Sequence, residues 1–252
     1  MKKIIALMLI LSMVFAFVAC TGAKDDVEDT TVADTTVADT TVAEDAEDEV
    51  KVMTYAEYAA AELEAEVVIE AYVQATQSWW DNKITVYAQD KDGAYFIYEL
   101  ACAEEDAAKL VAGQKIRVTG YKGEWAGEIE IMDATFELVE DADTFVAEAL
   151  DVTDLLGKDE LIDHQNKLVL FKGLTVKSIE YKNGEPGDDI YVTVTKDDAD
   201  YSFCVERYLT DPDTDVYKAV GELEAGDVVD VEGFLYWYEG VNTHITKVTV
   251  AE

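Results

Sequence analysis

The residue types that usually carry catalysis are scarce in this sequence. Only two histidines occur, His164 and His244, so a histidine-based triad or zinc site has almost no material. The sequence has no phosphate-binding loop, no dinucleotide-binding glycine pattern and no Gly-x-Ser-x-Gly elbow. Carboxylate pairs that could hydrolyse a glycoside are uninformative, because 55 acidic residues offer many such pairs. We therefore expect a binding protein rather than an enzyme.

Aromatic side chains are the main candidates for a binding site. Trp79, Trp80 and Trp125 lie in two predicted loops that flank one groove, and Tyr87 and Tyr95 are predicted to line its floor. Exposed rings offer flat surfaces to a sugar, a peptide or a partner protein. The alternative is that these rings pack the two halves of the protein together. The second half has a comparable set, namely Tyr191, Tyr236, Trp237 and Tyr238.

One acidic loop resembles part of a calcium-binding loop. Val216 stands where an EF-hand loop needs glycine for its sharp turn, and acid clusters arise easily in so acidic a chain. A solvated loop is therefore favoured over a calcium site, and no other cofactor is predicted. The four residues with the EF-hand spacing are Asp211, Asp213, Asp215 and Glu222.

The charge balance disfavours nucleic acid as a partner. The chain has 19 Lys and Arg against 55 Asp and Glu, a formal net charge of −36. Affinity for nucleic acid comes largely from basic side chains that displace counterions. A local strip of Lys115, Arg117 and Lys122 is the feature that would allow such binding. The simplest interpretation of the acidity is that it keeps an exposed protein soluble.

The N-terminus has the pattern of a bacterial lipoprotein. Residues 1–19 form a signal peptide with a basic start and an apolar run that is too short for a spanning helix. Residues 17–20, Phe-Val-Ala-Cys, resemble the lipobox, although phenylalanine stands where leucine is usual. The resemblance implies acylation of Cys20 and a lipid anchor on the extracytoplasmic face of the cell membrane. Simple secretion and an uncleaved anchor are the alternatives.

Residues 20–50 are predicted to be a disordered acidic linker. They contain no aromatic residue and repeat a unit of the type Thr-Thr-Val-Ala-Asp three times, from Thr30, Thr35 and Thr40. Such a segment has too little apolar area to offset its chain entropy. We expect it to act as a spacer.

Residues 51–252 contain an internal duplication. Each copy is predicted to have three strands, a short helix and two further strands, in residues 51–141 and 142–252. Short helical turns are expected at the start of the second copy. Cys102 and Cys204 occupy positions that are not equivalent and are predicted to be buried free thiols. Seven residues recur 113 positions later, beginning with Leu110, Gly113, Ile116, Val118, Gly120, Tyr121 and Gly127.

The predicted boundaries can be given for each copy. In the first, the strands are expected over 66–76, 83–88, 94–100, 115–121 and 128–139, with the helix over 104–111. In the second, they are expected over 167–181, 190–195, 201–205, 228–238 and 241–250, with a longer connection over 211–223. A capping box of Thr54 and Glu57 is expected before the first strand.

This order of elements resembles the OB-fold, a five-stranded Greek-key barrel with its helix between the third and fourth strands. Residues 110–120 and 223–233 resemble the passage from that helix into the fourth strand. The predicted fold class is all-β with short helices, as two tandem OB-like barrels. The chain also resembles tandem OB-fold lipoproteins of Gram-positive anaerobes, which implies location and fold but no activity.

The predicted function is non-enzymatic binding at the cell surface, as an adaptor for a glycan, a peptide or a protein. Two alternatives stay open. One is a structural interaction module with no small ligand, and the other is an OB-type nucleic-acid binder.

Overall fold

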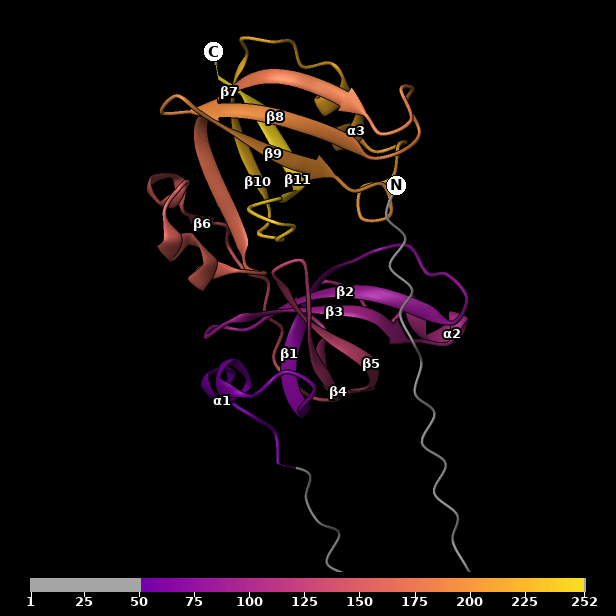
Figure 1. The fold of residues 1–252 in the computed structure, drawn as a ribbon. Helices are drawn as coiled ribbons and strands as arrows, with labels where there is room; N and C mark the ends of the chain where they lie inside the picture. The colour runs from indigo at the N-terminus through magenta and orange to yellow at the C-terminus, as the bar shows by residue number, and fades with distance from the viewer. Residues whose placement is uncertain (1–50, 252) are drawn as a thin grey trace, which may run out of the picture. The chain divides into compact units, whose positions relative to one another are not determined.

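The computed structural model describes residues 51–251, and the predicted signal peptide, Cys20 and the linker lie outside these residues. Figure 1 shows two groups of strands, the first coloured indigo to magenta and the second orange to yellow. The described residues belong to one compact unit. No helix in this part of the chain is long and apolar enough to cross a bilayer.

The first group of strands is an OB-type barrel. Its strands pair in the closed order β1-β2-β3-β5-β4, in which β3 and β5 are parallel and every other pair is antiparallel. The barrel interior holds one apolar core, which confirms the predicted fold class. Its strands are β1 (Glu66–Thr76), β2 (Lys83–Gln89), β3 (Ala94–Ala101), β4 (Lys115–Trp125) and β5 (Glu128–Leu138).

The short helices of the first barrel differ in how they are held. Helix α1 (Tyr55–Ala60) begins at the predicted capping box, in which the backbone N–H of Glu57 donates to the Thr54 hydroxyl. Helix α2 (Glu104–Ala107) is shorter than the predicted span of 104–111. None of its four residues is fully buried, and the chain beyond it still packs on the core through Leu110.

The second group repeats this strand order with a weaker closure. Its six strands have the order β10-β11-β9-β8-β7-β6, and β10 also pairs with β7. A single residue pair, His244 with Cys204, joins β11 to β9, so the second sheet is not a clear barrel. Its strands are β6 (Leu150–Asp151), β7 (Leu168–Tyr181), β8 (Ile190–Lys196), β9 (Ala199–Val205), β10 (Val228–Phe234) and β11 (His244–Val250).

Short helices lie between the strands of the second sheet. Two 3₁₀ helices, η1 (Thr153–Leu155) and η2 (Asp159–His164), stand where helical turns were predicted. Helix α3 (Asp215–Gly221) lies between β9 and β10. Strand β10 ends at Phe234, earlier than predicted, because the following residues turn back through an isolated bridge between Trp237 and Val241.

Two repeated glycines show why the duplicated sequence keeps its pattern. A Cβ atom added to Gly120 in β4 would lie 2.7 Å from Ile131, and one added to Gly233 in β10 would lie 2.3 Å from the His244 carbonyl oxygen. Each glycine therefore lets the neighbouring strand approach closely: β5 approaches β4 in the first sheet, and β11 approaches β10 in the second. The same close approach is required in both copies.

Candidate functional site

The first feature between the two copies is a buried aromatic contact, which we call the seam. Tyr87, Phe96 and Phe234 form it, and all three are buried. The rings of Tyr87 and Phe234 are stacked with centroids 4.5 Å apart, and Phe96 meets Tyr87 edge-on at 5.2 Å. Tyr87 belongs to β2 and Phe234 to β10, so this contact joins the two copies.

The hydroxyl of the seam residue Tyr87 is paired with a residue of the other copy. The hydroxyl of Tyr87 and Nδ1 of His244 lie 2.6 Å apart and share a hydrogen bond. Burial lowers the pKa of His244 to about 3, so the ring is neutral at neutral pH. In a neutral ring, Nδ1 donates or accepts according to the tautomer, and the Tyr87 hydroxyl can take the complementary role in either case. His244 is therefore a structural residue of the interface.

Glu128 at the start of β5 is the most deeply buried acid at this interface. Its side chain is fully buried, and its Oε2 accepts a hydrogen bond of 2.8 Å from the backbone N–H of Trp237. Its other oxygen has no hydrogen-bond partner among residues 51–251. Burial raises the pKa of Glu128 to about 9, so the carboxyl is protonated at neutral pH.

Next to the seam lies an open cleft of about 820 Å³. Strands β3 and β5 of the first barrel contribute one wall, and β8, β9 and the residues leading into β11 contribute the other. The cleft therefore lies where the single residue pair joins β9 to β11. The aromatic rings that line the cleft are Phe96, Tyr98, Trp125, Tyr191, Tyr236 and Tyr238.

Two acceptor groups that line the cleft have no donor. Glu130 in β5 is only 5% exposed and makes no side-chain hydrogen bond or ion pair with the described residues. Burial raises the pKa of its carboxyl. The side-chain oxygen of Asn242 is also buried without a partner among residues 51–251. Acceptors without donors are costly, and these two lie on opposite walls, so the cleft is suited to a ligand that donates hydrogen bonds.

The other charged groups of the cleft are already engaged. Lys182 and Asp189 form an ion pair of 2.8 Å. The carboxylate of Glu206 accepts hydrogen bonds from the backbone N–H groups of Tyr208 and Leu209, although burial still raises its pKa. Glu130 thus stands apart as the carboxylate that nothing compensates.

A second hollow of about 600 Å³ adjoins the cleft, and Gln77 and Tyr98 line both. Trp80 and Tyr208 lie in this second hollow and are 79% and 55% exposed. Along the two hollows, Trp125 and Tyr98 are also well exposed. The exposed rings therefore follow one continuous path across both copies.

Four of the aromatic residues predicted for the binding site line neither the cleft nor the adjoining hollow. Tyr95 is buried in the first core against Tyr58, with centroids 4.9 Å apart, and Tyr87 is buried in the seam, so neither lines a groove floor. Trp79 packs partly on that core and donates to the Cys102 carbonyl oxygen at 2.9 Å. Trp237 packs on the second core and does not line the cleft.

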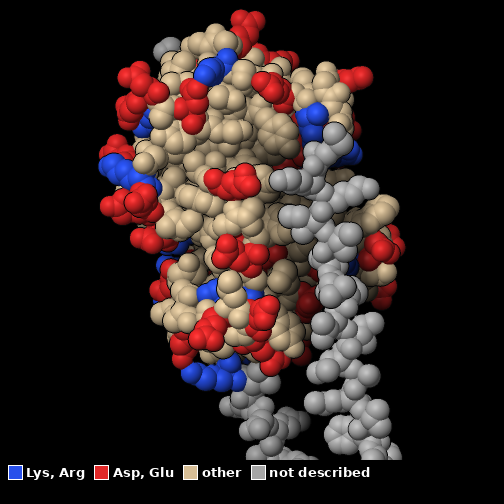
Figure 2. Space-filling view, in the orientation of Figure 1, with Lys and Arg blue, Asp and Glu red and all other residues tan. Residues whose placement is uncertain are grey.

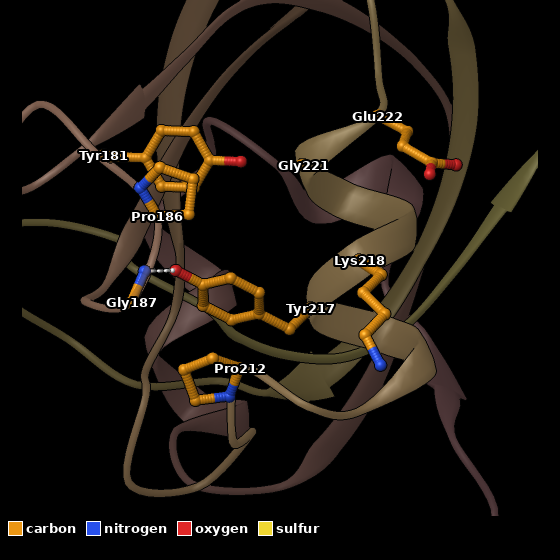
Figure 3. A pocket seen from close by; sticks show the side chains of 8 residues that line it. All are labelled: Tyr181, Pro186, Gly187, Pro212, Tyr217, Lys218, Gly221 and Glu222. Carbon is orange, nitrogen blue, oxygen red and sulfur yellow. Dashed lines mark hydrogen bonds between the residues drawn. The ribbon is translucent and has the colours of Figure 1, made fainter.

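The predicted calcium loop does not gather its acids. Asp211 uses a carboxylate oxygen to accept the backbone N–H of Asp213, and Asp215 begins α3. Glu222 follows the last residue of α3, and Figure 3 shows it at the opposite end of the helix from Pro212. The part of the chain that the structure describes contains no cluster of three potential metal ligands. Helix α3 thus separates Glu222 from Asp211 and Asp213, so the structure does not bring the four acids of the EF-hand spacing together.

The hollow drawn in Figure 3 is a weaker candidate than the cleft. Its volume is about 400 Å³, and it lies between α3 and the loop that follows β7. The Tyr217 hydroxyl accepts from the Gly187 N–H at 2.8 Å and donates to the Asp188 carbonyl oxygen at 2.6 Å. Tyr217 supports this loop and offers its hydroxyl to no ligand.

The three members of the local basic strip are paired or buried within the protein. Lys115 and Arg117 both pair with Glu70, at 2.7 and 2.8 Å. Lys122 is buried and donates to three backbone carbonyl oxygens at the end of α1. On the face shown in Figure 2, the basic side chains lie among acidic ones and form no basic patch.

Both cysteines in the described residues are buried free thiols, as predicted. Burial raises the pKa of Cys204, which lines the cleft, so its thiol stays protonated and poorly nucleophilic.

Comparisons with known proteins identify no family for this chain. No family model matches the chain, and no curated protein matches it. The matching solved structures include a murine DNA-binding protein bound to double-stranded DNA, with 12% sequence identity and a TM-score of 0.36. That match covers 73% of this chain and 96% of the other. They also include a deletion mutant of the single-stranded DNA-binding protein of Thermus aquaticus, with 13% sequence identity and a TM-score of 0.23. That match covers 74% of this chain and 94% of the other. At such scores, the OB assignment depends on the strand order of the first barrel.

Proposed function

We propose that this chain is a non-enzymatic ligand-binding protein and that the cleft is its binding site. The observation that carries the proposal is the pairing of exposed rings with a buried carboxylate that has no partner. A cleft of about 820 Å³ with a few converging polar groups is typical of a small-ligand or segment-binding site. A ligand there would contact both copies at once.

The purely structural alternative accounts for only part of the aromatic set. It explains Tyr87, Phe234 and Trp237, which pack against the seam or a core. It leaves Trp80 and Trp125 without a role, although they are 79% and 62% exposed beside the two hollows. Large exposed rings that gather along one path indicate an interaction site.

Nucleic acid is the competing ligand class. Binding of a single strand to an OB-type barrel combines stacked bases with a basic groove. This chain offers the rings, but its net charge is −36 and the predicted basic strip is paired or buried. These charges favour a ligand that is not a polyanion.

The test is a screen of the purified protein against glycan and peptide arrays, with a fluorescent single-stranded oligonucleotide as a third arm. We expect array ligands whose binding falls at least tenfold in Trp125→Ala. Tyr121→Ala is the matched control, because Tyr121 is 45% exposed on β4 and lines neither hollow. Ligands that bind Trp125→Ala normally would overturn the proposed site, and oligonucleotide binding at physiological salt would favour the competitor.

We also propose that a lipid on Cys20 anchors the protein to the outer face of the cell membrane. The support is the sequence alone: a basic start, a short apolar run and the lipobox-like residues 17–20. Cys20→Ser is expected to abolish lipid labelling and to release the protein from membranes. A variant that stays membrane-bound with residues 1–19 intact would favour an uncleaved anchor.

A further inference from the structure

We infer that the cleft binds an organic cation, whose ammonium or guanidinium group contacts Glu130 among the rings of Tyr98 and Tyr236. This inference rests on the proposed function and names the chemical class of its ligand. The same chemistry occurs in a free amine and in a Lys or Arg side chain of a peptide. The experiment below separates these two sources.

The first argument is the unbalanced charge of the cleft. The one basic side chain that lines it, Lys182, is already paired with Asp189, so it does not compensate Glu130. Glu130 is 5% exposed, and burial raises the pKa of its carboxyl because the ionised form has lost water without gaining a partner. A bound cation would supply that partner.

The second argument is the aromatic surround. Phe96 and Tyr98 contribute rings with centroids 6.4 Å apart, and Tyr236 meets Phe96 edge-on at 5.2 Å. All three rings line the cleft with Glu130. The faces of aromatic rings attract cations, and the attraction increases when water is excluded. Rings and a carboxylate around one hollow therefore favour a cation over a neutral ligand.

The third argument concerns hydrogen bonds. The cleft offers two acceptors that lack donors, the carboxylate of Glu130 and the side-chain oxygen of Asn242. An ammonium group has three donors and no acceptor, and a guanidinium group has five donors. Either group would donate to the Glu130 carboxylate while adding no acceptor of its own. The strongly negative net charge would also attract a cation from solution.

The experiment is calorimetric titration of the purified protein at 150 mM NaCl with two pairs of probes. In each pair, one probe carries a single positive charge and the other is neutral. The first pair is an end-capped Gly-Lys-Gly peptide and the same peptide with an acetylated lysine, which is neutral. The second pair is butylamine and butanol. Single charges limit non-specific attraction to the acidic surface.

We expect the lysine peptide or butylamine to bind at least tenfold more tightly than its neutral counterpart. Glu130→Gln should remove that difference while keeping the shape of the side chain. Glu62→Gln is the matched control, because it makes the same charge change at an exposed residue outside the cleft and should shift the affinity less than twofold. Binding of the peptide without binding of butylamine would identify a basic peptide as the source.

Other outcomes separate this inference from the proposed function. If neutral array ligands bind through Trp125 and Glu130→Gln leaves all affinities unchanged, the cation inference fails and the binding site stands. If neither cations nor array ligands bind, both fail. A melting temperature of Glu130→Gln equal to or above that of the wild type shows that lost binding does not come from unfolding.

Discussion

The seam and the cleft lie side by side between the two copies, and aromatic rings line both. In the seam, Tyr87 stacks on Phe234 and its hydroxyl pairs with His244, so both ring and polar atom are engaged. In the cleft, Trp125 is 62% exposed and Glu130 has no partner among residues 51–251. The two regions therefore differ in their contacts: the seam ring is covered and its hydroxyl is paired, whereas the cleft offers an exposed ring and an unpaired carboxylate.

Phe234→Ala should have the largest effect on stability. The ring belongs to the seam and to neither core, and its loss would leave a cavity against Tyr87. Truncation of a buried phenylalanine costs about 3–5 kcal/mol of the free energy of unfolding. Urea unfolding followed by circular dichroism measures the loss. A change in the free energy of unfolding below about 0.5 kcal/mol, similar to that of the exposed Tyr121→Ala, would show that the seam does not stabilise the protein.

Glu128→Gln should stabilise the protein by about 1–3 kcal/mol at pH 7. The folded protein raises the pKa of Glu128 from an ordinary value near 4.5 to about 9, so the folded state binds the proton more tightly. The wild type should therefore lose stability as the pH rises from about 5 to 9. Glutamine mimics the protonated form and can keep the hydrogen bond from the Trp237 N–H.

The measurement is the free energy of unfolding of both proteins at pH 5, 7 and 8.5. The advantage of Glu128→Gln should grow with pH. Glu124→Gln, a change at an exposed acid on β4, is the control and should show no such trend. An advantage that is constant across the series would mean that Glu128 is ionised in the folded protein.

Trp125→Ala should have the smallest effect on stability, within about 0.5 kcal/mol. Its ring is mostly exposed and belongs to neither core nor seam. Thermal unfolding of the variant beside Phe234→Ala sharpens the contrast between the cleft and the seam. A loss above about 2 kcal/mol would assign Trp125 to packing and remove it from the proposed site.

The sequence by itself determined much of the fold. The spacing of 113 residues and the alternation of apolar residues predicted the strand order, because inward residues of a barrel must alternate with outward ones. Gly120 and Gly233 recur because each permits a close approach of strands within its own sheet. Such contacts depend on local geometry, which the sequence pattern records.

Only the tertiary structure decided which outward residues are covered and which line the cleft. Tyr87 points out of the first core, and a ring from β10 buries it. Glu128 and Glu130 are two positions apart on β5, so the sequence places them on one face, but sequence reasoning did not select them as site residues. Their burial depends on residues more than 100 positions away, such as Trp237 and Tyr236. Strand periodicity contains no information about that docking, because it records only the two faces of each strand.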